Sequence, residues 1–173
     1  KLQLLLSSFC NISTENIVLS LFFSSSKHNS NLHIFGLISD GGVHSHINHL
    51  FGILELCKKE NVKNVYLDLC TDGRDTYEKS SLKYLDELQD KMNELQIGKI
   101  NTIQGRYYGM DRDNNFDRIK KSYDAIVYAD APKYNSYKEL IEENYNNDKT
   151  DEFIVPGLIE GVKLEDNDGV IVY

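Results

Sequence analysis

The chain has 173 residues, of which 40% are hydrophobic and 27% are charged, a composition typical of a soluble globular domain with its own core. Its formal net charge of −8 argues against nucleic acid as a partner, because phosphate backbones are bound by basic surfaces. Any anionic small molecule must therefore be held by a local cluster of positive charge.

The three cysteines indicate the compartment of the protein. Cys10, Cys57 and Cys70 are odd in number and lack CxxC spacing, which argues against a disulfide framework or a zinc site. A reducing cytoplasm is therefore expected. The longest apolar run, Ile17–Phe23, is too short to cross a bilayer, so no membrane contact is expected. The chain begins with Lys1 rather than Met, and we interpret it as a fragment of a longer protein.

Regular elements begin near residue 32. The first 31 residues mix Ser, Asn and short apolar runs without a clear period, whereas residues 32–173 are expected to form one domain. Apolar runs bounded by turn residues predict strands. These strands are Leu32–Ser39, Val65–Cys70, Ile100–Gln104 and, shorter, Phe153–Val155 and Val170–Tyr173.

Helices are predicted between these strands, where apolar residues recur at helical spacing. They run from Ile47 to Lys59, from Leu82 to Leu95, from about Asn114 to Tyr128, and after Ser136 to about Asn146. A strand, a loop and a helix repeated three times imply βαβ units. The sequence therefore predicts an α/β fold with an open, mostly parallel sheet and helices on both faces.

Arginine is scarce, and its placement is selective. Four arginines stand against fifteen lysines, and the lysines are scattered over predicted helix surfaces. Arg74, Arg106 and Arg112 fall in loops directly after predicted strands, while Arg118 falls early in the following helix. The planar guanidinium pairs two donors with a carboxylate or a phosphate. The pattern therefore points to a small anion that carries phosphate or carboxylate.

Three polar loops are expected to converge on one edge of the sheet. They are Asp40–His46, Thr71–Thr76 and Gly105–Asp113, and each follows a predicted strand. In an open α/β sheet, ligands bind at the carboxyl ends of the strands. The N-termini of the helices after these loops would add backbone N–H donors.

Each of these features also has a purely structural interpretation. Arg118 is expected to pair with a surface carboxylate, so we leave it out of the site. Arg112 could be neutralised by the aspartates on either side of it. Asp75 and Glu78 could be a helix N-cap and its box partner. Three such loops at matching positions nevertheless favour a common binding site.

A histidine cluster follows the first predicted strand. His44, His46 and His49, with Asp40 nearby, could supply nitrogen and oxygen ligands to a metal. No second cluster with ligand spacing appears downstream, so a metal site is not expected in this chain. A P-loop, a dinucleotide fingerprint and a GxSxG elbow are also lacking. The sequence therefore predicts an anion site without a covalent catalyst.

Three long segments resemble the signature blocks of the cofactor-independent phosphoglycerate mutases. They are HIFGLISDGGVHSHINHLF (His33–Phe51), TDGRDT (Thr71–Thr76) and GRYYGMDRDNNFDRIKKSYDA (Gly105–Ala125), in the family's order and at its spacing. The resemblance runs from about Leu32 to Tyr173 and fades upstream. It implies an α/β substrate-binding domain that is inserted into a larger phosphatase-like domain.

The resemblance also implies an activity for the parent enzyme. Family members interconvert 3-phosphoglycerate and 2-phosphoglycerate in glycolysis and gluconeogenesis, without 2,3-bisphosphoglycerate. A serine of the phosphatase-like domain, served by two manganese ions, takes the phosphoryl group. Because this serine and the Mn²⁺ ligands lie outside the chain, we expect the isolated chain to be inactive. The parent enzyme is expected to be a monomer.

Five residues of this chain match the family's substrate-binding positions. The resemblance implies that they hold the substrate, and they are His44, Arg74, Asp75, Arg106 and Arg112. Asp75 would handle a proton of a substrate hydroxyl as a general acid or base. The arginines would hold carboxylate and phosphate while the phosphoryl group moves.

The chain departs from the family pattern at three positions. Asp68 stands where many members have histidine, Tyr77 replaces a usual proline, and Phe116 replaces a usual tryptophan. A further arginine pair and a lysine of the family pattern would lie beyond Tyr173. Two other interpretations stay open: a non-catalytic phospho-anion-binding module, and an independent metal hydrolase that uses the histidine cluster.

Overall fold

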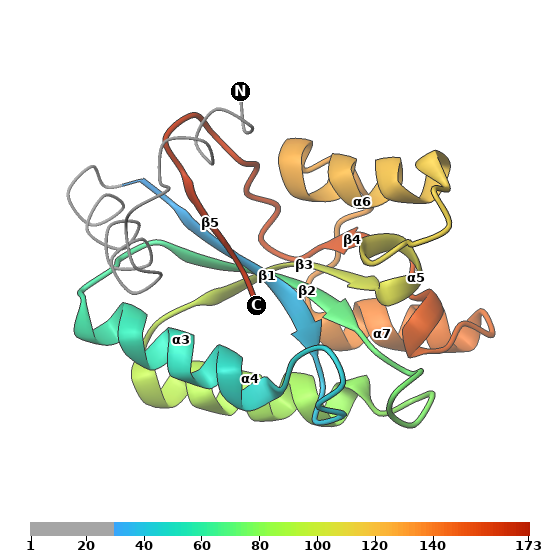
Figure 1. Cartoon of the computed structure of the whole chain (residues 1–173), viewed down its shortest axis with the longest axis horizontal. Coiled ribbons are helices and arrows are strands. Elements are labelled where there is room, and N and C mark those ends of the chain that lie inside the picture. Colours follow the sequence, from blue (N-terminus) through green and yellow to red (C-terminus); the bar gives the residue numbers. More distant parts are fainter. Residues whose placement is uncertain (1–29) are drawn as a thin grey trace.

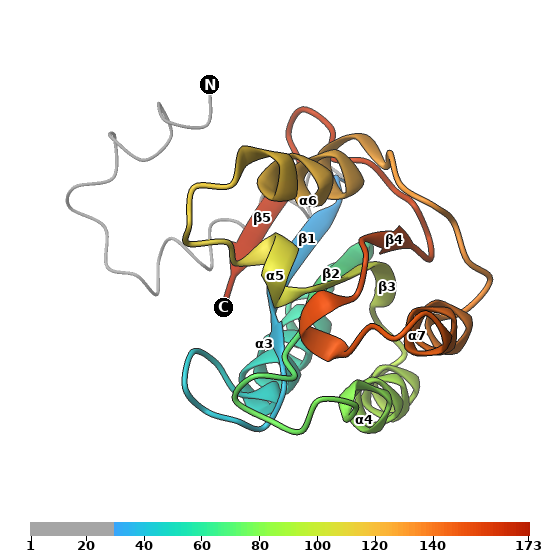
Figure 2. The ribbon, with the colours of Figure 1, turned by 90° about the vertical axis from the view of Figure 1, so that its right-hand side faces the viewer.

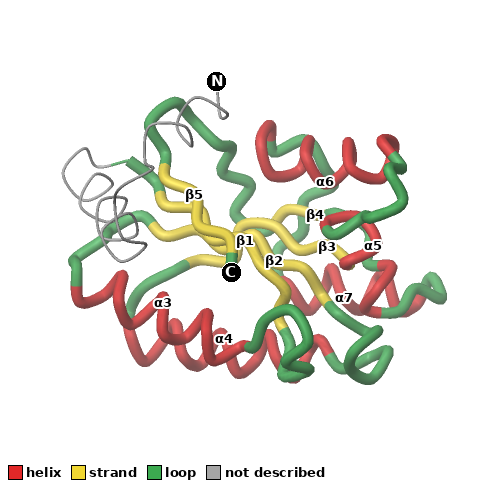
Figure 3. The backbone as a smooth tube through the Cα atoms, in the orientation of Figure 1, coloured by secondary structure: helices red, strands yellow, loops and turns green. Residues whose placement is uncertain are grey.

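A five-stranded sheet forms the centre of the computed structural model, which describes residues 30–173 (Figures 1 and 3). Its strands lie in the order β4-β3-β2-β1-β5. They are β1 (Leu32–Ile38), β2 (Val65–Thr71), β3 (Lys99–Gly105), β4 (Gly157–Leu158) and β5 (Gly169–Val172). Strands β1, β2, β3 and β5 run parallel, and only β4 runs antiparallel to its neighbour. The predicted α/β class and mostly parallel sheet are therefore confirmed.

Helices cover both faces of this sheet. Helices α3 (Ile47–Lys59) and α4 (Ser81–Leu95) lie side by side on one face, and α6 (Phe116–Tyr128) lies on the other (Figure 1). Helix α7 (Tyr137–Asn146) packs against α4, as the end-on view in Figure 2 shows. The single turn α5 (Arg106–Gly109) directly follows β3. The described residues thus form one α/β domain.

The hydrophobic core lies between the sheet and helices α3 and α4. Side chains alternate along a strand, so Ile34 and Ile38 of β1 share a face with Leu67 and Leu69 of β2. All four are fully buried. The helices contribute Leu50, Leu54, Leu85 and Leu88. Burial of each such side chain contributes about 1.5–3 kcal/mol, so this layer is a main source of stability.

The opposite face of the sheet carries a buried polar network around Asp68. The Asp68 carboxylate accepts hydrogen bonds from His33 Nδ1 (2.8 Å), Asn101 Nδ2 (2.9 Å) and Thr102 Oγ1 (2.8 Å). A buried carboxylate is tolerated only when such donors satisfy it. The departure from the family's usual histidine at this position is therefore accommodated within the fold.

Two predictions about the chain after β3 are wrong. A helical turn, α5, stands where a loop was expected, and Phe153–Val155 is not a strand. The segment forms a 3₁₀ turn, η1 (Asp151–Phe153), followed by β4. The backbone of this segment forms hydrogen bonds with the ends of two strands. Thr71 Oγ1 donates to the Asp151 carbonyl, and Gly105 N–H donates to the Ile154 carbonyl. These tertiary bonds replace a regular strand ladder.

The start of α4 also differs from one interpretation of the sequence. The helix begins at Ser81, so Asp75 and Glu78 are not its cap and box partner. Instead, the carboxylate of Asp151 accepts hydrogen bonds from the backbone N–H groups of Ser80 (2.7 Å) and Ser81 (2.8 Å). A carboxylate from a distant segment thus caps the helix and ties η1 to it.

Two of the three cysteines are described, and both Cys57 and Cys70 are buried free thiols. Cys10 and the run Ile17–Phe23, together with the rest of residues 1–29, lie outside the described residues. Among the helices of residues 30–173, none is long and apolar enough to span a membrane.

Candidate anion-binding site

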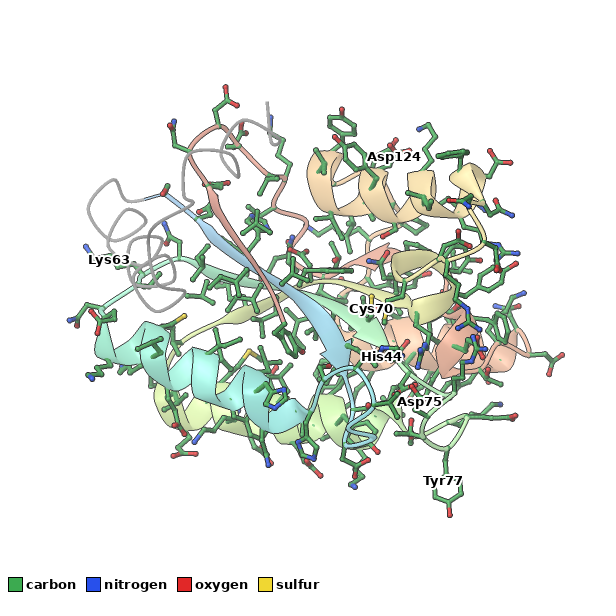
Figure 4. The ribbon with its side chains drawn as sticks, viewed as in Figure 1. His44, Lys63, Cys70, Asp75, Tyr77 and Asp124 are labelled. Carbon is green, nitrogen blue, oxygen red and sulfur yellow. The ribbon has the colours of Figure 1, made fainter. Side chains whose placement is uncertain are left out.

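The carboxyl ends of β1, β2 and β3 open onto a cleft of about 370 Å³. Figure 4 places His44 and Asp75 at this end of the sheet and Lys63 at the opposite end. All four arginines of the chain line the cleft, together with His44. The structure therefore brings the three predicted loops together. It also adds groups that the sequence did not predict, namely Tyr107, Asp111, Glu152 and Phe153.

Arg106 lies at the centre of this arrangement. Its position at the start of α5 directs the side chain back over the β2 loop, where it is only 9% exposed. Nη1 donates to Asp72 Oδ1 (2.8 Å) and to Asp75 Oδ2 (2.6 Å), and Nη2 lies 2.9 Å from His44 Nε2. One guanidinium thus connects the ends of all three strands.

His44 accepts a hydrogen bond from Arg106. Arginine has only donors, so His44 Nε2 must act as the acceptor, and the imidazole proton then resides on Nδ1. The side chain is 47% exposed, and its Nε2 lies 3.7 Å from Asp75 Oδ2. The partly exposed His44 thus leaves its Nδ1–H as a hydrogen-bond donor.

Asp72 holds the loops in place and was not predicted as a site residue. Its Oδ1 accepts from the backbone N–H groups of Arg74 (3.2 Å) and Asp75 (3.0 Å) as well as from Arg106, and its Oδ2 accepts from Ser39 Oγ (2.7 Å). Burial alone would raise the pKa of Asp72. These hydrogen bonds outweigh burial and hold its pKa below the ordinary value.

Asp75 sits at the border of the cleft rather than within it. Its carboxylate lines an adjacent open hollow with Gly41, Thr76 and Lys83, while Arg74 lines both the hollow and the cleft. The side chain is 22% exposed. Asp75 thus has one oxygen on Arg106 and remains partly accessible from solvent.

Arg74 is the most loosely held of the paired arginines. Its Nη1 lies 3.7 Å from Glu152 Oε1, and the side chain is 49% exposed. The contact requires η1 to lie close to the β2 loop, and two glycines permit this. A Cβ at Gly73, whose φ is +66°, would lie 2.7 Å from Asp151 Cβ, and one at Gly105 would lie 2.1 Å from the Glu152 carbonyl oxygen.

The last two arginines differ in their pairing. Arg118 pairs with the exposed Asp113, as expected, and also with Asp111, whose side chain is fully buried. Arg118 lines the cleft, although it was left out of the predicted site. Arg112 is not neutralised by its neighbours, because Asp111 and Asp113 both pair with Arg118. Within residues 30–173, no carboxylate lies at ion-pairing distance from Arg112. Arg118 occupies the first turn of a helix that starts at this edge, and that position is the signal in the sequence that could have revealed it.

The described residues do not form a metal centre. No group of three or more His, Cys, Asp or Glu side chains within residues 30–173 is arranged to hold a metal ion. His46 Nδ1 accepts from the backbone N–H of Asn48 (3.1 Å), and His49 Nδ1 accepts from that of His46 (3.3 Å), as caps of α3. With His44 Nε2 facing Arg106, the three histidines do not converge on one point.

Comparison with known proteins identifies the family. A family model described as the BPG-independent PGAM N-terminus (iPGM_N) matches residues 10–173. The chain belongs to this family. A 2,3-bisphosphoglycerate-independent phosphoglycerate mutase of Listeria welshimeri is 50% identical over 165 residues, which are 92% of this chain and 32% of that protein. Its counterpart in Staphylococcus aureus (strain COL) is 52% identical over 149 residues, 85% of this chain and 30% of that protein.

The fold agrees with that of a solved phosphoglycerate mutase. A structure of the Leishmania mexicana phosphoglycerate mutase matches with a TM-score of 0.82 and 31% sequence identity, covering 90% of this chain and 32% of that one. The chain thus spans about a third of the length of the phosphoglycerate mutases it matches. Of the three departures from the family pattern, Tyr77 (89% exposed) and Phe116 (75% exposed) lie on the surface, and none lines the cleft.

Proposed function

We propose that residues 32–173 bind phosphoglycerate within a larger enzyme that interconverts 3-phosphoglycerate and 2-phosphoglycerate. The observation that carries the proposal is the gathering of all four arginines and His44 in one cleft of about 370 Å³. A phosphate and a carboxylate on a three-carbon skeleton need several fixed cationic donors. Membership in the phosphoglycerate mutase family and the relatives' names support the same ligand.

The arginines have different parts in this binding. Arg106 is buried and held by two carboxylates and His44, so it supplies a preorganised donor whose geometry changes little on binding. Arg74 and Arg112 are exposed, and both can turn toward an anion. Each charge-assisted hydrogen bond contributes about 1.5–3 kcal/mol, so three arginines suffice for specific binding of a small dianion.

Asp75 is the residue of this chain that we propose for proton transfer. As a carboxylate it can accept the proton of the glycerate hydroxyl that becomes phosphorylated and return a proton to the hydroxyl that is released. Arg106 fixes one carboxylate oxygen at 2.6 Å. The other oxygen has no hydrogen-bond partner among residues 30–173, which supports this proposal.

The remaining chemistry belongs to the part of the enzyme outside this chain. There we expect the serine that carries the phosphoryl group, as a phosphoserine intermediate, and two manganese ions that activate it. The described residues contain no site for these ions, so we assign no step of the reaction to a metal in this domain. We further propose that the parent enzyme is a cytoplasmic monomer that acts in glycolysis and gluconeogenesis.

A turnover assay tests this division of labour. We expect the 173-residue chain with manganese to produce no 2-phosphoglycerate from 3-phosphoglycerate in a coupled assay, whereas the full-length enzyme turns over. Full-length Asp75→Asn should lose kcat more than about 100-fold, the usual size of a general acid–base contribution. Manganese-dependent turnover by the isolated chain would contradict the proposal.

A further inference from the structure

The guanidinium of Arg118 stacks on an aromatic ring and also pairs with two carboxylates. The carbon of its guanidinium lies 3.9 Å from the centroid of the Tyr107 ring, and the Tyr107 ring lies 5.0 Å from that of Phe153. Its Nη1 donates to Asp111 Oδ1 (3.1 Å) and to Asp113 Oδ2 (3.4 Å). A guanidinium on an aromatic face with two carboxylates has little rotational freedom.

The partner Asp111 connects Arg118 to the loop that carries Arg112. The Asp111 side chain is fully buried, and its second oxygen accepts from the backbone N–H of Asn115 at 2.9 Å. Asn115 is the N-cap of α6 and ends the loop that Asp111 begins. Arg112 lies between these two points, so the Arg118–Asp111 pair closes the loop around it.

The pairing of Asp111 and Asp113 with Arg118 leaves Arg112 without a carboxylate partner in the described part of the chain. Two aspartates flank Arg112 in sequence, and either could neutralise it. Both are instead paired with Arg118. Without Arg118, the loop would hold two carboxylates against one arginine, and the exposed Asp113 would be free to pair with Arg112. Buried Asp111 would also lose its cation, which is costly for a buried carboxylate.

We propose that Arg118 is a positioning residue for anion binding, which keeps Arg112 available by occupying Asp111 and Asp113 and by closing the loop between them. This inference rests on the proposed function for the identity of the anion. In this proposal Arg118 acts through Arg112 rather than through its own contact with the ligand. It therefore differs from the five residues that we propose for substrate contact.

The first arm of the test measures the Kd for 3-phosphoglycerate with the 173-residue chain. Arg118→Gln should weaken binding about tenfold, the loss expected when one charge-assisted contact is removed. Arg118→Lys should restore less than half of this loss in free energy, because lysine lacks the planar fork. Lys120→Gln removes a charge from the same helix outside the cleft and should change Kd less than about twofold.

The second arm asks whether Arg118 acts through Arg112. In an Arg112→Ala background, Arg118→Gln should add less than about a twofold effect, because the two residues form one unit. In an Arg118→Gln background, Asp113→Asn should recover part of the affinity, because no carboxylate then captures Arg112. Fully additive effects of the two arginine substitutions, or no recovery with Asp113→Asn, would overturn the proposal.

A third measurement needs no ligand. Amide hydrogen exchange at Asn115 N–H should be at least about tenfold faster in Arg118→Gln than in the wild type, and unchanged in Lys120→Gln. Unchanged exchange at Asn115 would overturn the proposal even in a folded variant. If the wild-type chain does not bind 3-phosphoglycerate, that result counts against the proposed function, and the exchange rates still decide whether Arg118 closes the loop.

Discussion

Arg106 Nη1 and Asp75 Oδ2 lie 2.6 Å apart, and the same nitrogen also donates to Asp72 Oδ1 at 2.8 Å. This relationship joins the end of β3 to the loop after β2, beside the cleft. Because Asp72 also accepts from Ser39 at the end of β1, the three loops share a single ionic network. The site is therefore held rigid by groups that also stabilise the fold.

Asp72 should make the stability of the protein depend on pH. Asp72→Asn should lower the free energy of unfolding by about 3 kcal/mol at pH 7, because it breaks a buried ion pair. The pKa of Asp72 is depressed in the folded state, so the stability it contributes is present above the unfolded pKa, near 4, and is lost as pH falls through the folded pKa. Urea unfolding at pH 7, 5 and 3 measures this, with the exposed Asp166→Asn as control. A difference between wild type and Asp72→Asn that persists unchanged at pH 3 would refute the assignment.

In the wild type, the carboxylate of Glu152 should weaken anion binding. Its carboxylate lies 3.7 Å from Arg74 and lines the cleft, so it competes with an anion for this arginine. Glu152→Gln should therefore tighten the Kd for 3-phosphoglycerate about threefold to fivefold, as removal of one nearby like charge predicts. Glu160→Gln, which breaks a surface pair with Lys99, serves as the matched control and should leave Kd unchanged. Weaker binding by Glu152→Gln would mean that Glu152 orders Arg74 for the ligand.

Gly105 should be irreplaceable for a steric reason. An added Cβ would lie 2.1 Å from the Glu152 carbonyl oxygen, so Gly105→Ala must displace η1. We expect a loss of at least about 2 kcal/mol in the free energy of unfolding and weaker anion binding. Gly52→Ala on helix α3 is the control, because an added Cβ there would have no heavy atom from outside this helix within 4 Å among the described residues. It should raise the free energy of unfolding by about 0.5–1 kcal/mol, since alanine favours helix more than glycine does. Equal Tm values for both variants would contradict this account.

The two described thiols should be inert in the folded protein. Burial raises the pKa of Cys57 and of Cys70 to about 12, so almost no thiolate is present at pH 8. In a Cys10→Ser variant, a thiol-specific chromogenic reagent should react with neither residue at pH 8 and with both after denaturation. Stoichiometric reaction of the native variant within minutes would show that one of these thiols is accessible.

The sheet and its helices could be predicted from the sequence because their signals are local. Strands such as Val65–Thr71 are largely buried and consist mostly of apolar residues, and α4 shows clear helical spacing. The turn α5 could not be predicted, because four residues are too few to show a helical period. The segment Asp151–Phe153 could not be predicted either, because bonds from Thr71 and Gly105 fix its backbone. No periodicity in its own residues encodes those contacts.

The candidate site was also predictable only in part. Placement after strands was enough to predict that Arg74, Arg106 and Arg112 share one edge, because strand topology fixes that edge. The pairing pattern was not predictable. The sequence places Arg112 between two aspartates, yet both of them pair with Arg118 in the structure. Which carboxylate pairs with which arginine depends on side-chain geometry within the folded loop.

The most direct test of the central claim is a titration of the 173-residue chain with 3-phosphoglycerate, followed by backbone amide chemical shifts at low salt. We predict saturable shifts centred on Asp40–His46, Thr71–Thr76 and Gly105–Asp113. Excess sulfate should displace the ligand, and Arg112→Ala should weaken binding at least tenfold. Well-dispersed spectra that do not respond to 3-phosphoglycerate, or shifts that survive unchanged in Arg112→Ala, would contradict the claim that this cleft is the phosphoglycerate site.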